Sequence, residues 1–481
     1  MSTADTKRPP TVGLSLLVAL VVGSIIGSGI FALPQNMAVG AGAGAILIGW
    51  LITGVGMLML AFVYQMLAMR KPELDNGIYA YARALAGEYV GFNAAWGYWL
   101  SAWIGNVGYL VVAFGALGYF YPAFGEGNTP QAILGASVVL WTVHGLVLRG
   151  IQGATVLNAV ITIAKLVPLL LFIAVLITFF SIDTFKLDFW GNAELGSVLA
   201  QVKSTMLVTV WVFIGIEGAS VYSARAKNRL DVGRATVIGF LICLALLGAV
   251  SLLSLGVMSQ PELAQLKNPS MAAVLEKAVG HWGALVIYIG LMVSVGGGFL
   301  AWTLLAAESL FTPATGGVMP TALTRLNSKG VPANALWVTN AMVQLFLILT
   351  LLSKATYLAL ISLSTAMILL PYLFSAVYGA KVAWTEANSA QAAIKNISNG
   401  DSMKLVVVVA SGYCLWLLYA AGVKYLLLSA LLYVPGAAIY FWAKRQRNER
   451  AFSTAESAGL VVLFGLACVA AYLLVTQKIA L

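Results

Sequence analysis

The sequence predicts an all-α polytopic membrane protein, and three observations carry this prediction. Of the 481 residues, 61% are hydrophobic and only 9% are charged, against roughly 25% charged in an ordinary soluble domain. Apolar stretches of about 20 residues, the length of a membrane-spanning helix, recur along the whole chain. The first stretch is interrupted by Gly and Pro and is followed by many more, so we interpret it as a retained span and not as a cleaved leader.

Hydropathy and loop signals predict thirteen spans. They cover residues 13–34, 42–68, 91–121, 131–148, 154–180, 199–223, 236–258, 282–311, 333–352, 355–382, 404–421, 425–443 and 457–476. Residues 1–12 form an N-terminal segment, and residues 383–481 hold helices 11 to 13. The side of the membrane that holds the C-terminus depends on the thirteenth span.

The distribution of Lys and Arg orients these spans. With the N-terminus in the cytoplasm, the segments on its side collect nineteen Lys and Arg residues and the opposite segments collect seven, which is a strong positive-inside bias. Of the 27 Lys and Arg residues, Lys165 alone remains within the membrane. The net charge of +10 therefore reflects topology and contact with anionic membrane lipid, and no basic groove interleaved with aromatic residues indicates a nucleic acid partner.

Residue types that carry catalysis or metal binding are sparse. Cys243, Cys414 and Cys468 lie singly in apolar runs, and His144 and His281 are also isolated. No HExxH, GxSxG or P-loop motif is present. The sequence therefore predicts neither an enzyme nor a metal or cofactor site.

The first span contains helix breakers at its centre. Residues 23–36 read GSIIGSGIFALPQN, and in a helix interior Gly costs about 1 kcal/mol and Pro about 3 kcal/mol relative to Ala. An unpaired peptide group in hydrocarbon costs several kcal/mol, so a break is tolerated only where it lines a cavity and another group satisfies the backbone. Close helix packing by small residues is the alternative explanation for the glycines.

The sixth span has a second interruption. Residues 206–228 read MLVTVWVFIGIEGASVYSARAKN, with Gly215, Gly218 and the carboxylate of Glu217 at the centre. Because this span lies five after the first, two units of five helices place the interrupted spans in corresponding positions. That arrangement is typical of an inverted-repeat fold whose binding site lies between the broken helices.

The expected inverted-repeat core covers residues 13–382, with repeat one at 13–180 and repeat two at 199–382. Exposed N–H groups at a half-helix N-terminus favour a carboxylate, and freed carbonyls at a C-terminal end favour an ammonium group. An α-amino acid carries both ions a short distance apart. We therefore expect the 5+5 core, with broken helices 1 and 6, to bind a zwitterion of this kind.

Five stretches of the sequence, taken together, resemble a known family. They are GSIIGSGIFALPQN, YWLSAWIGN (98–106), WVFIGIEGAS (211–220), AWTLLAAES (301–309) and LLPYL (369–373). In this combination the chain is similar to the amino acid–polyamine–organocation superfamily, in its basic amino acid antiporter branch. The similarity runs over spans one to twelve, and it is strongest to the arginine/ornithine antiporters of the arginine deiminase pathway.

The resemblance implies a secondary active antiporter of the cytoplasmic (inner) membrane. Such a carrier exchanges extracellular arginine for intracellular ornithine by alternating access. The alternatives left open are a proton-coupled basic amino acid permease and exchangers of arginine for agmatine, lysine for cadaverine or histidine for histamine. Homodimers are frequent in the family.

The resemblance also assigns the amino acid head group. Ser28 and the main-chain N–H of Gly29 would receive the substrate carboxylate. Carbonyls of Ile25, Trp211 and Ile214 would receive the α-ammonium group. Trp211 resembles in addition the aromatic plug that closes over bound substrate.

The substrate side chain is assigned to a second group of residues. Trp302 matches a family position whose ring stacks on the guanidinium of arginine, and Asn106 would hydrogen-bond the distal nitrogens. Ser101, Ala102 and Ser364 would line the same region. The arginine/agmatine relatives have Asn where this chain has Ser24 and Ser where it has Val212, so side-chain selectivity does not carry over.

We expect three charged residues to be buried in the membrane, where an ionisable group is by default a functional hypothesis. The resemblance places Glu217 at the cytoplasmic closure with Tyr98 and Tyr372, with a role in gating or proton coupling; a structural carboxylate is the alternative. Lys165 would hold span five to the break in span one in place of a sodium ion. Glu308 lies six residues beyond Trp302, and we expect it near the inner mouth or in a structural role.

Overall fold

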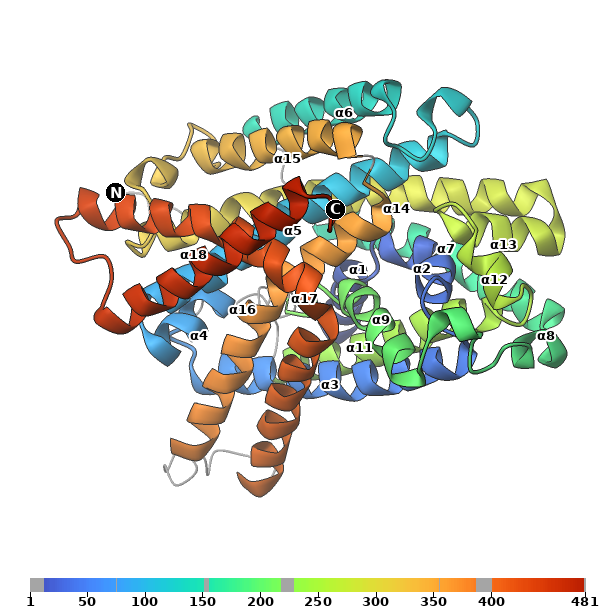
Figure 1. Ribbon diagram of the computed structural model, residues 1–481, viewed down its shortest axis with the longest axis horizontal. Coiled ribbons are helices and arrows are strands. Elements are labelled where there is room, and N and C mark those ends of the chain that lie inside the picture. The colour runs from blue at the N-terminus through green and yellow to red at the C-terminus, as the bar shows by residue number, and fades with distance from the viewer. Residues whose placement is uncertain are drawn as a thin grey trace, which may run out of the picture.

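The computed structural model describes residues 13–74, 76–150, 155–217, 229–353, 355–385 and 400–479. Every regular element in these ranges is helical, and none of them contains a strand. Many of the long helices run along the longest axis of the molecule (Figure 1). The all-helical fold class predicted from the sequence is confirmed.

The helices follow one another with short connections. The first half contains α1 (Leu14–Ile25), the 3-10 helix η1 (Gly29–Ala32), α2 (Leu33–Ala38), α3 (Ala43–Arg70), α4 (Gly77–Ala86), α5 (Glu88–Leu117), α6 (Pro130–Leu148), α7 (Thr155–Phe179) and α8 (Ile182–Lys186). The second half contains α9 (Val198–Trp211), α11 (Arg229–Ser254), α12 (Gln260–Ala264), α13 (Ser270–Val279), α14 (His281–Thr315), α15 (Ala333–Ser353), α16 (Tyr357–Thr385), α17 (Gly400–Gln446) and α18 (Thr454–Val475).

Ten of the described helices are long and apolar enough to cross a membrane, and the bent pair Leu14–Ile25 and Gly29–Ala38 makes eleven. α17 contains Gly422 with φ 75°, so a break divides it between the predicted spans 404–421 and 425–443. α9 corresponds to the first part of the predicted sixth span, whose residues 218–228 lie outside the described ranges. Each predicted span thus coincides with a described helix or with part of one.

Several spans begin at a side chain that satisfies the first helical turn. The hydroxyl of Thr129 accepts the N–H of Ala132 at the start of α6. At the start of α18, Ser453 and Glu456 form a reciprocal capping box. These contacts matter because the first N–H groups of a helix have no partner within it.

α5 lies at the centre of the bundle. It packs against α4, α14 and α16. In its most apolar stretch of 18 residues, 89% is buried, whereas only 11% of the corresponding stretch of α18 is buried. α18 packs against α17 at the periphery. α5 and α16 are the two most buried spans. Of the broken helices, α9 packs against α16, whereas α1 packs against α7 and α11.

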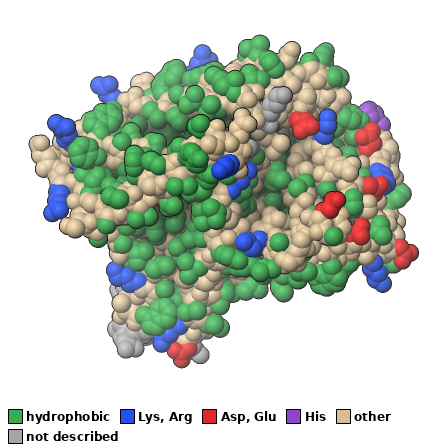
Figure 2. Space-filling view, in the orientation of Figure 1, with side chains coloured by type: hydrophobic (Ala, Val, Ile, Leu, Met, Phe, Trp, Pro, Cys, Tyr) green, Lys and Arg blue, Asp and Glu red, His purple; other side chains and the backbone are tan. Residues whose placement is uncertain are grey.

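The surface divides along the longest axis. Hydrophobic side chains cover the middle of the molecule, Lys and Arg gather toward the end near α4, and most acidic side chains in view lie toward the end near α8, α12 and α13 (Figure 2). We call these ends the α4 end and the α13 end. A middle apolar zone between two polar ends is the surface expected of a protein in a bilayer.

Candidate functional site

The first span is broken within the segment GSIIGSGIFALPQN. α1 ends at Ile25, and η1 and α2 continue the span with a bend of 48°. Ile26 is extended, with φ −77° and ψ 98°, so the carbonyls of the last turn of α1 lose their helical partners. The break therefore exposes acceptor groups at the end of α1 and begins a new helical turn at Gly29.

Lys165 of α7 lies against this break. Its side chain is 3% exposed, and its Nζ donates to the carbonyls of Gly23, at 2.7 Å, and of Ile26. The ammonium group thus satisfies two of the carbonyls that the break frees. The structure places Lys165 between spans one and five, which is the position that the family resemblance implies.

The break in the sixth span faces the first. α9 ends at Trp211, and residues 212–217 form turns. Gly215 has φ 109°, a conformation that only glycine adopts readily. The hydroxyl of Ser24 lies 3.1 Å from the carbonyl oxygen of Gly215, so the two breaks contact each other. Gly218 lies outside the described residues.

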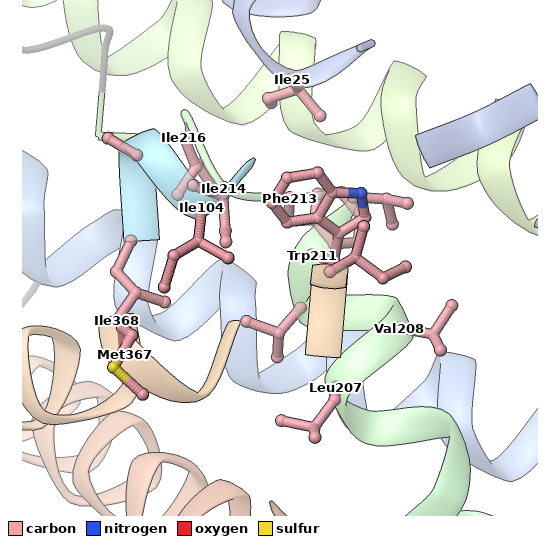
Figure 3. Close-up of a cluster of buried hydrophobic side chains, with 14 of the residues drawn as sticks. Ile25, Ile104, Leu207, Val208, Trp211, Phe213, Ile214, Ile216, Met367 and Ile368 are labelled. Atoms are coloured by element: carbon pink, nitrogen blue, oxygen red, sulfur yellow. The ribbon is translucent and has the colours of Figure 1, made fainter. Parts of the chain in front are cut away.

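A small cavity, which we call the central cavity, lies between the two breaks. Its lining includes seven of the predicted site residues, namely Ile25, Gly29, Ser101, Ala102, Trp211, Ile214 and Trp302. Its volume is about 20 Å³, which is room for about one water molecule. Figure 3 shows Trp211 and Ile214 gathered near Ile25 and Ile104. The site is therefore closed in this conformation.

Tyr357, the first residue of α16, joins the two breaks. Its hydroxyl lies 3.1 Å from the hydroxyl of Ser28 and accepts the indole N–H of Trp211 at 3.3 Å. A Cβ on Gly29 would lie 2.8 Å from Trp211 Nε1. The absence of a side chain at Gly29 thus lets the indole lie directly against the start of η1.

The remaining predicted site residues lie on α5 and α16. The hydroxyl of Ser364 donates to the carbonyl of Ser101 at 2.7 Å. The Asn106 amide donates from Nδ2 to the hydroxyl of Thr303 at 3.3 Å. Its Oδ1 is buried and has no partner among the described residues.

Glu217 connects the sixth-span break to α5 and α16. Its carboxylate accepts the hydroxyls of Tyr98, at 2.8 Å, and of Tyr372, at 2.9 Å, and the N–H of Gly215, at 3.2 Å. The side chain is 8% exposed. Three donors thus surround the carboxylate, which fixes the relative position of the three elements that carry them.

Two larger cavities continue from the central cavity toward the α4 end. The Glu217 cavity, of about 190 Å³, shares Gly27, Tyr109 and Trp302 with the central cavity. The Glu308 cavity, of about 380 Å³, shares Tyr98, Leu305 and Glu217 with the Glu217 cavity and reaches α4. Side chains at the two boundaries therefore separate three consecutive chambers.

At the α13 end, a set of amide side chains holds α2 against α12 and α13. We call Gln35, Asn36, Gln260 and Asn268 the amide cluster. Asn268 Nδ2 donates to Gln35 Oε1 and Asn36 Oδ1, each at 3.0 Å, and Gln260 Nε2 donates to the carbonyl of Ala38 at 2.7 Å. The second half of the broken first span is thus attached to the α12–α13 segment.

Comparison with known proteins identifies the family. Residues 12–463 match the family model described as amino acid permease. The chain belongs to the amino acid permease family. Among relatives of this permease, the "Arginine/ornithine antiporter" of Pseudomonas aeruginosa is 54% identical over 470 residues, 95% of this chain and 96% of the relative.

Two further relatives of the permease carry other names. The "L-lysine transport protein" of Corynebacterium glutamicum is 45% identical over 96% of this chain and 94% of the relative. The "Arginine/agmatine antiporter" of Chlamydia pneumoniae is 41% identical over 99% of each chain. The family and these names are those of transport proteins, so the permease is a transporter and not an enzyme.

The sequence did not reveal two tyrosines of the permease site. Tyr357 bridges Ser28 and Trp211, and Tyr109 lines both the central and the Glu217 cavities. A Cβ on Gly27 would lie 2.2 Å from the Tyr109 hydroxyl. Gly27 and Gly29 were the available signal, because each lets an aromatic side chain lie against the backbone of the first break. Their presence does not predict which aromatic residue lies there.

Proposed function

We propose that the permease is a secondary active antiporter that exchanges extracellular arginine for intracellular ornithine by alternating access. The observation that carries this proposal is the contact between two broken spans, which brings a helix start and two helix ends to one cavity. Such ends complement a carboxylate and an ammonium group. The name of the relative from Pseudomonas aeruginosa supports the choice of arginine and ornithine.

The head group of the amino acid would bind at the two breaks. Ser28 and the N–H of Gly29 receive the carboxylate, after the Ser28 hydroxyl exchanges its Tyr357 partner for the ligand. The carbonyls of Ile25, Trp211 and Ile214 receive the α-ammonium group. In the closed structure the Trp211 carbonyl accepts the N–H of Ile214 at 3.2 Å, and its second lone pair can serve the ligand.

The cationic side chain would extend along α5 and α14. Trp302 stacks on the guanidinium, and Asn106 Oδ1, a buried acceptor without a partner among the described residues, accepts from its distal nitrogens. Ser101, Ala102 and Ser364 line the same space. An unused buried acceptor is the kind of group that a donor-rich cation satisfies.

The permease would lie in the cytoplasmic (inner) membrane. Its α4 end would face the cytoplasm. The Lys and Arg residues that gather toward this end support that orientation by the positive-inside rule. Tyr98, Glu217 and Tyr372 then form the closure between the Glu217 cavity, which adjoins the central cavity, and the Glu308 cavity at the cytoplasmic end. Trp211 forms the closure over the substrate. Lys165 would hold span five against span one in place of sodium.

Exchange between purified permease and substrate in liposomes tests the function. Liposomes are loaded with ornithine, arginine, lysine or agmatine, and entry of labelled arginine is measured with and without a proton gradient. We expect ornithine to drive arginine entry without a proton gradient, because both carry a net charge of +1 at neutral pH. If arginine entered agmatine-loaded or lysine-loaded liposomes faster than ornithine-loaded ones, the permease would instead have a function like that named for the relative from Chlamydia pneumoniae or from Corynebacterium glutamicum.

Replacing Trp302 by leucine is expected to weaken arginine binding roughly tenfold, because a desolvated cation–π contact contributes up to about 2 kcal/mol. Arginine binding to the purified variant in detergent measures the change. Trp442→Leu is the matched control, since Trp442 is 50% exposed on the surface. Equal arginine affinity in the two variants would refute the stacking role.

A further inference from the structure

The Glu308 cavity is larger than the central cavity and is built differently. Its volume is about 380 Å³, which is enough for an amino acid side chain with bound water. It lies between α4 and α14, and Glu308, Ser309 and Thr312 of α14 contribute polar groups to its wall. In the proposed exchange, substrate passes through this chamber on its way to and from the cytoplasm.

The charge of the chamber has one sign. Glu217 and Glu308 are the charged side chains in its described lining, which includes no Lys, Arg or His. Glu217 is engaged by two tyrosine hydroxyls and the N–H of Gly215. The Glu308 residue is exposed, and the described part of the chain shows no hydrogen bond or ion pair to its carboxylate. A carboxylate in this setting attracts cations into the chamber.

Aromatic faces complete the wall. Tyr64, Tyr79, Tyr81 and Tyr98 all line the chamber. Tyrosine rings attract a cation that lies over them within about 6 Å of the ring centroid. The hydroxyl of Tyr64, whose residue is 4% exposed, has no partner among the described residues. Carboxylate and aromatic faces together are the groups that recognise guanidinium and ammonium ions.

We propose that the Glu308 cavity is a second binding site for the cationic side chain of the transported amino acid, with Glu308 as its charge partner. This inference rests on the proposed exchange of basic amino acids. The cavity shares Tyr98, Leu305 and Glu217 with the next chamber inward. A cation held at Glu308 therefore lies beside the closure that leads to the central site.

Such a site would make substrate recognition differ between the two sides of the membrane. It raises the occupancy of cationic substrate at the α4 end and contributes nothing to a neutral amino acid of the same shape. Because it lies beyond Glu217 from the central cavity, substrate that enters from the α13 end reaches the central site first. Glu308 should thus affect apparent affinity from the α4 end alone.

Membrane vesicles of defined orientation allow the apparent affinity for substrate to be measured separately on each side of the membrane. Inside-out vesicles expose the cytoplasmic side and right-side-out vesicles the extracellular side of the full-length permease. The KM for labelled arginine, ornithine and citrulline, the neutral analogue of arginine, is measured on each side for the wild type, Glu308→Gln and Glu308→Asp. Glu73→Gln is the matched control, because the Glu73 side chain is 63% exposed and lies outside all three cavities.

We expect Glu308→Gln to raise the cytoplasmic KM for arginine and ornithine about fivefold. Its extracellular KM and its KM for citrulline should match those of the wild type. Glu308→Asp, which keeps the charge, should lie nearer the wild type, and Glu73→Gln should not differ from it. An unchanged cytoplasmic KM in Glu308→Gln, or an equal rise on both sides, would overturn the proposal.

If Glu308→Gln does not fold, the proposal can be tested on the wild type alone. Raising the ionic strength should increase the cytoplasmic KM for arginine and leave that for citrulline unchanged, because salt screens a charge exposed to solvent. A cytoplasmic KM for arginine that is insensitive to salt would contradict the second site. If the wild type exchanges no basic amino acid at all, the proposed function fails, and that outcome is distinct from both results.

Discussion

Replacing Lys165 by methionine is expected to abolish exchange and to lower the free energy of unfolding by at least about 2 kcal/mol. The ammonium group donates to the carbonyls of Gly23 and Ile26, and its side chain is 3% exposed. Methionine has a similar length but no donor, so both acceptors would remain buried without a partner. Thermal unfolding of the purified variant and its exchange rate in liposomes measure the two effects.

Lys267→Met is the control for this change, because the Lys267 side chain is 77% exposed and its ion pair with Glu126 is long, at 3.6 Å. Surface ion pairs contribute about 0–1 kcal/mol. A Lys165→Met variant that exchanges arginine at the rate of Lys267→Met would show that the broken span does not depend on the ammonium. Since a fixed cation already lies at the break, we also expect wild-type exchange to be equally fast in sodium and in choline buffers.

Replacing Gly29 by alanine is expected to reduce the exchange rate at least tenfold while the protein remains folded. The added Cβ would lie 2.8 Å from both Trp211 Nε1 and Val212 Cγ1. Overpacking of this kind costs about 1–3 kcal/mol, and about 1.4 kcal/mol corresponds to a factor of ten. The cost falls on the closed conformation, because the indole must leave its position against η1. Exchange of labelled arginine in liposomes reports the rate.

Gly412→Ala is the matched variant, since a Cβ at that helical position would meet nothing within 4 Å. It should exchange arginine at the wild-type rate and unfold at or above the wild-type temperature. Arginine binding in detergent then distinguishes two explanations for slow exchange in Gly29→Ala. A loss of arginine affinity would indicate damage to the carboxylate site. Retained affinity would indicate that Trp211 no longer closes against η1. Exchange at the wild-type rate would remove Gly29 from the mechanism.

The positions of the two breaks were predictable from the sequence, because helix breakers in a hydrophobic span have few explanations. Gly27, Gly29 and Pro34 interrupt an apolar run, and the bend of 48° lies among them. The grouping of Tyr98, Glu217 and Tyr372 came from the family resemblance, and these residues form one hydrogen-bonded cluster in the structure. Their part in gating or proton coupling stays a prediction.

Other features depend on packing that the sequence does not display. Tyr357 lies far along the chain from Ser28, and only the fold of α16 against the first span brings their hydroxyls to 3.1 Å. The chamber at Glu308 is likewise formed by α4 and α14, whose sequences show no common motif. The indole of Trp211 lies against Gly29 and Gly105 in the closed structure, and these contacts join segments that are far apart in the sequence.

The amide cluster at the α13 end would raise the free energy needed to open that end of the permease. An opening of this end that separates α2 from α12 and α13 would break the hydrogen bonds from Asn268 to Gln35 and Asn36 and from Gln260 to Ala38, at about 0.5–1.5 kcal/mol each. A loaded carrier can offset this with the free energy of closing around its ligand, whereas an empty one cannot. Return of the empty carrier would therefore be slow, and substrate would leave the cell only in exchange for substrate that enters.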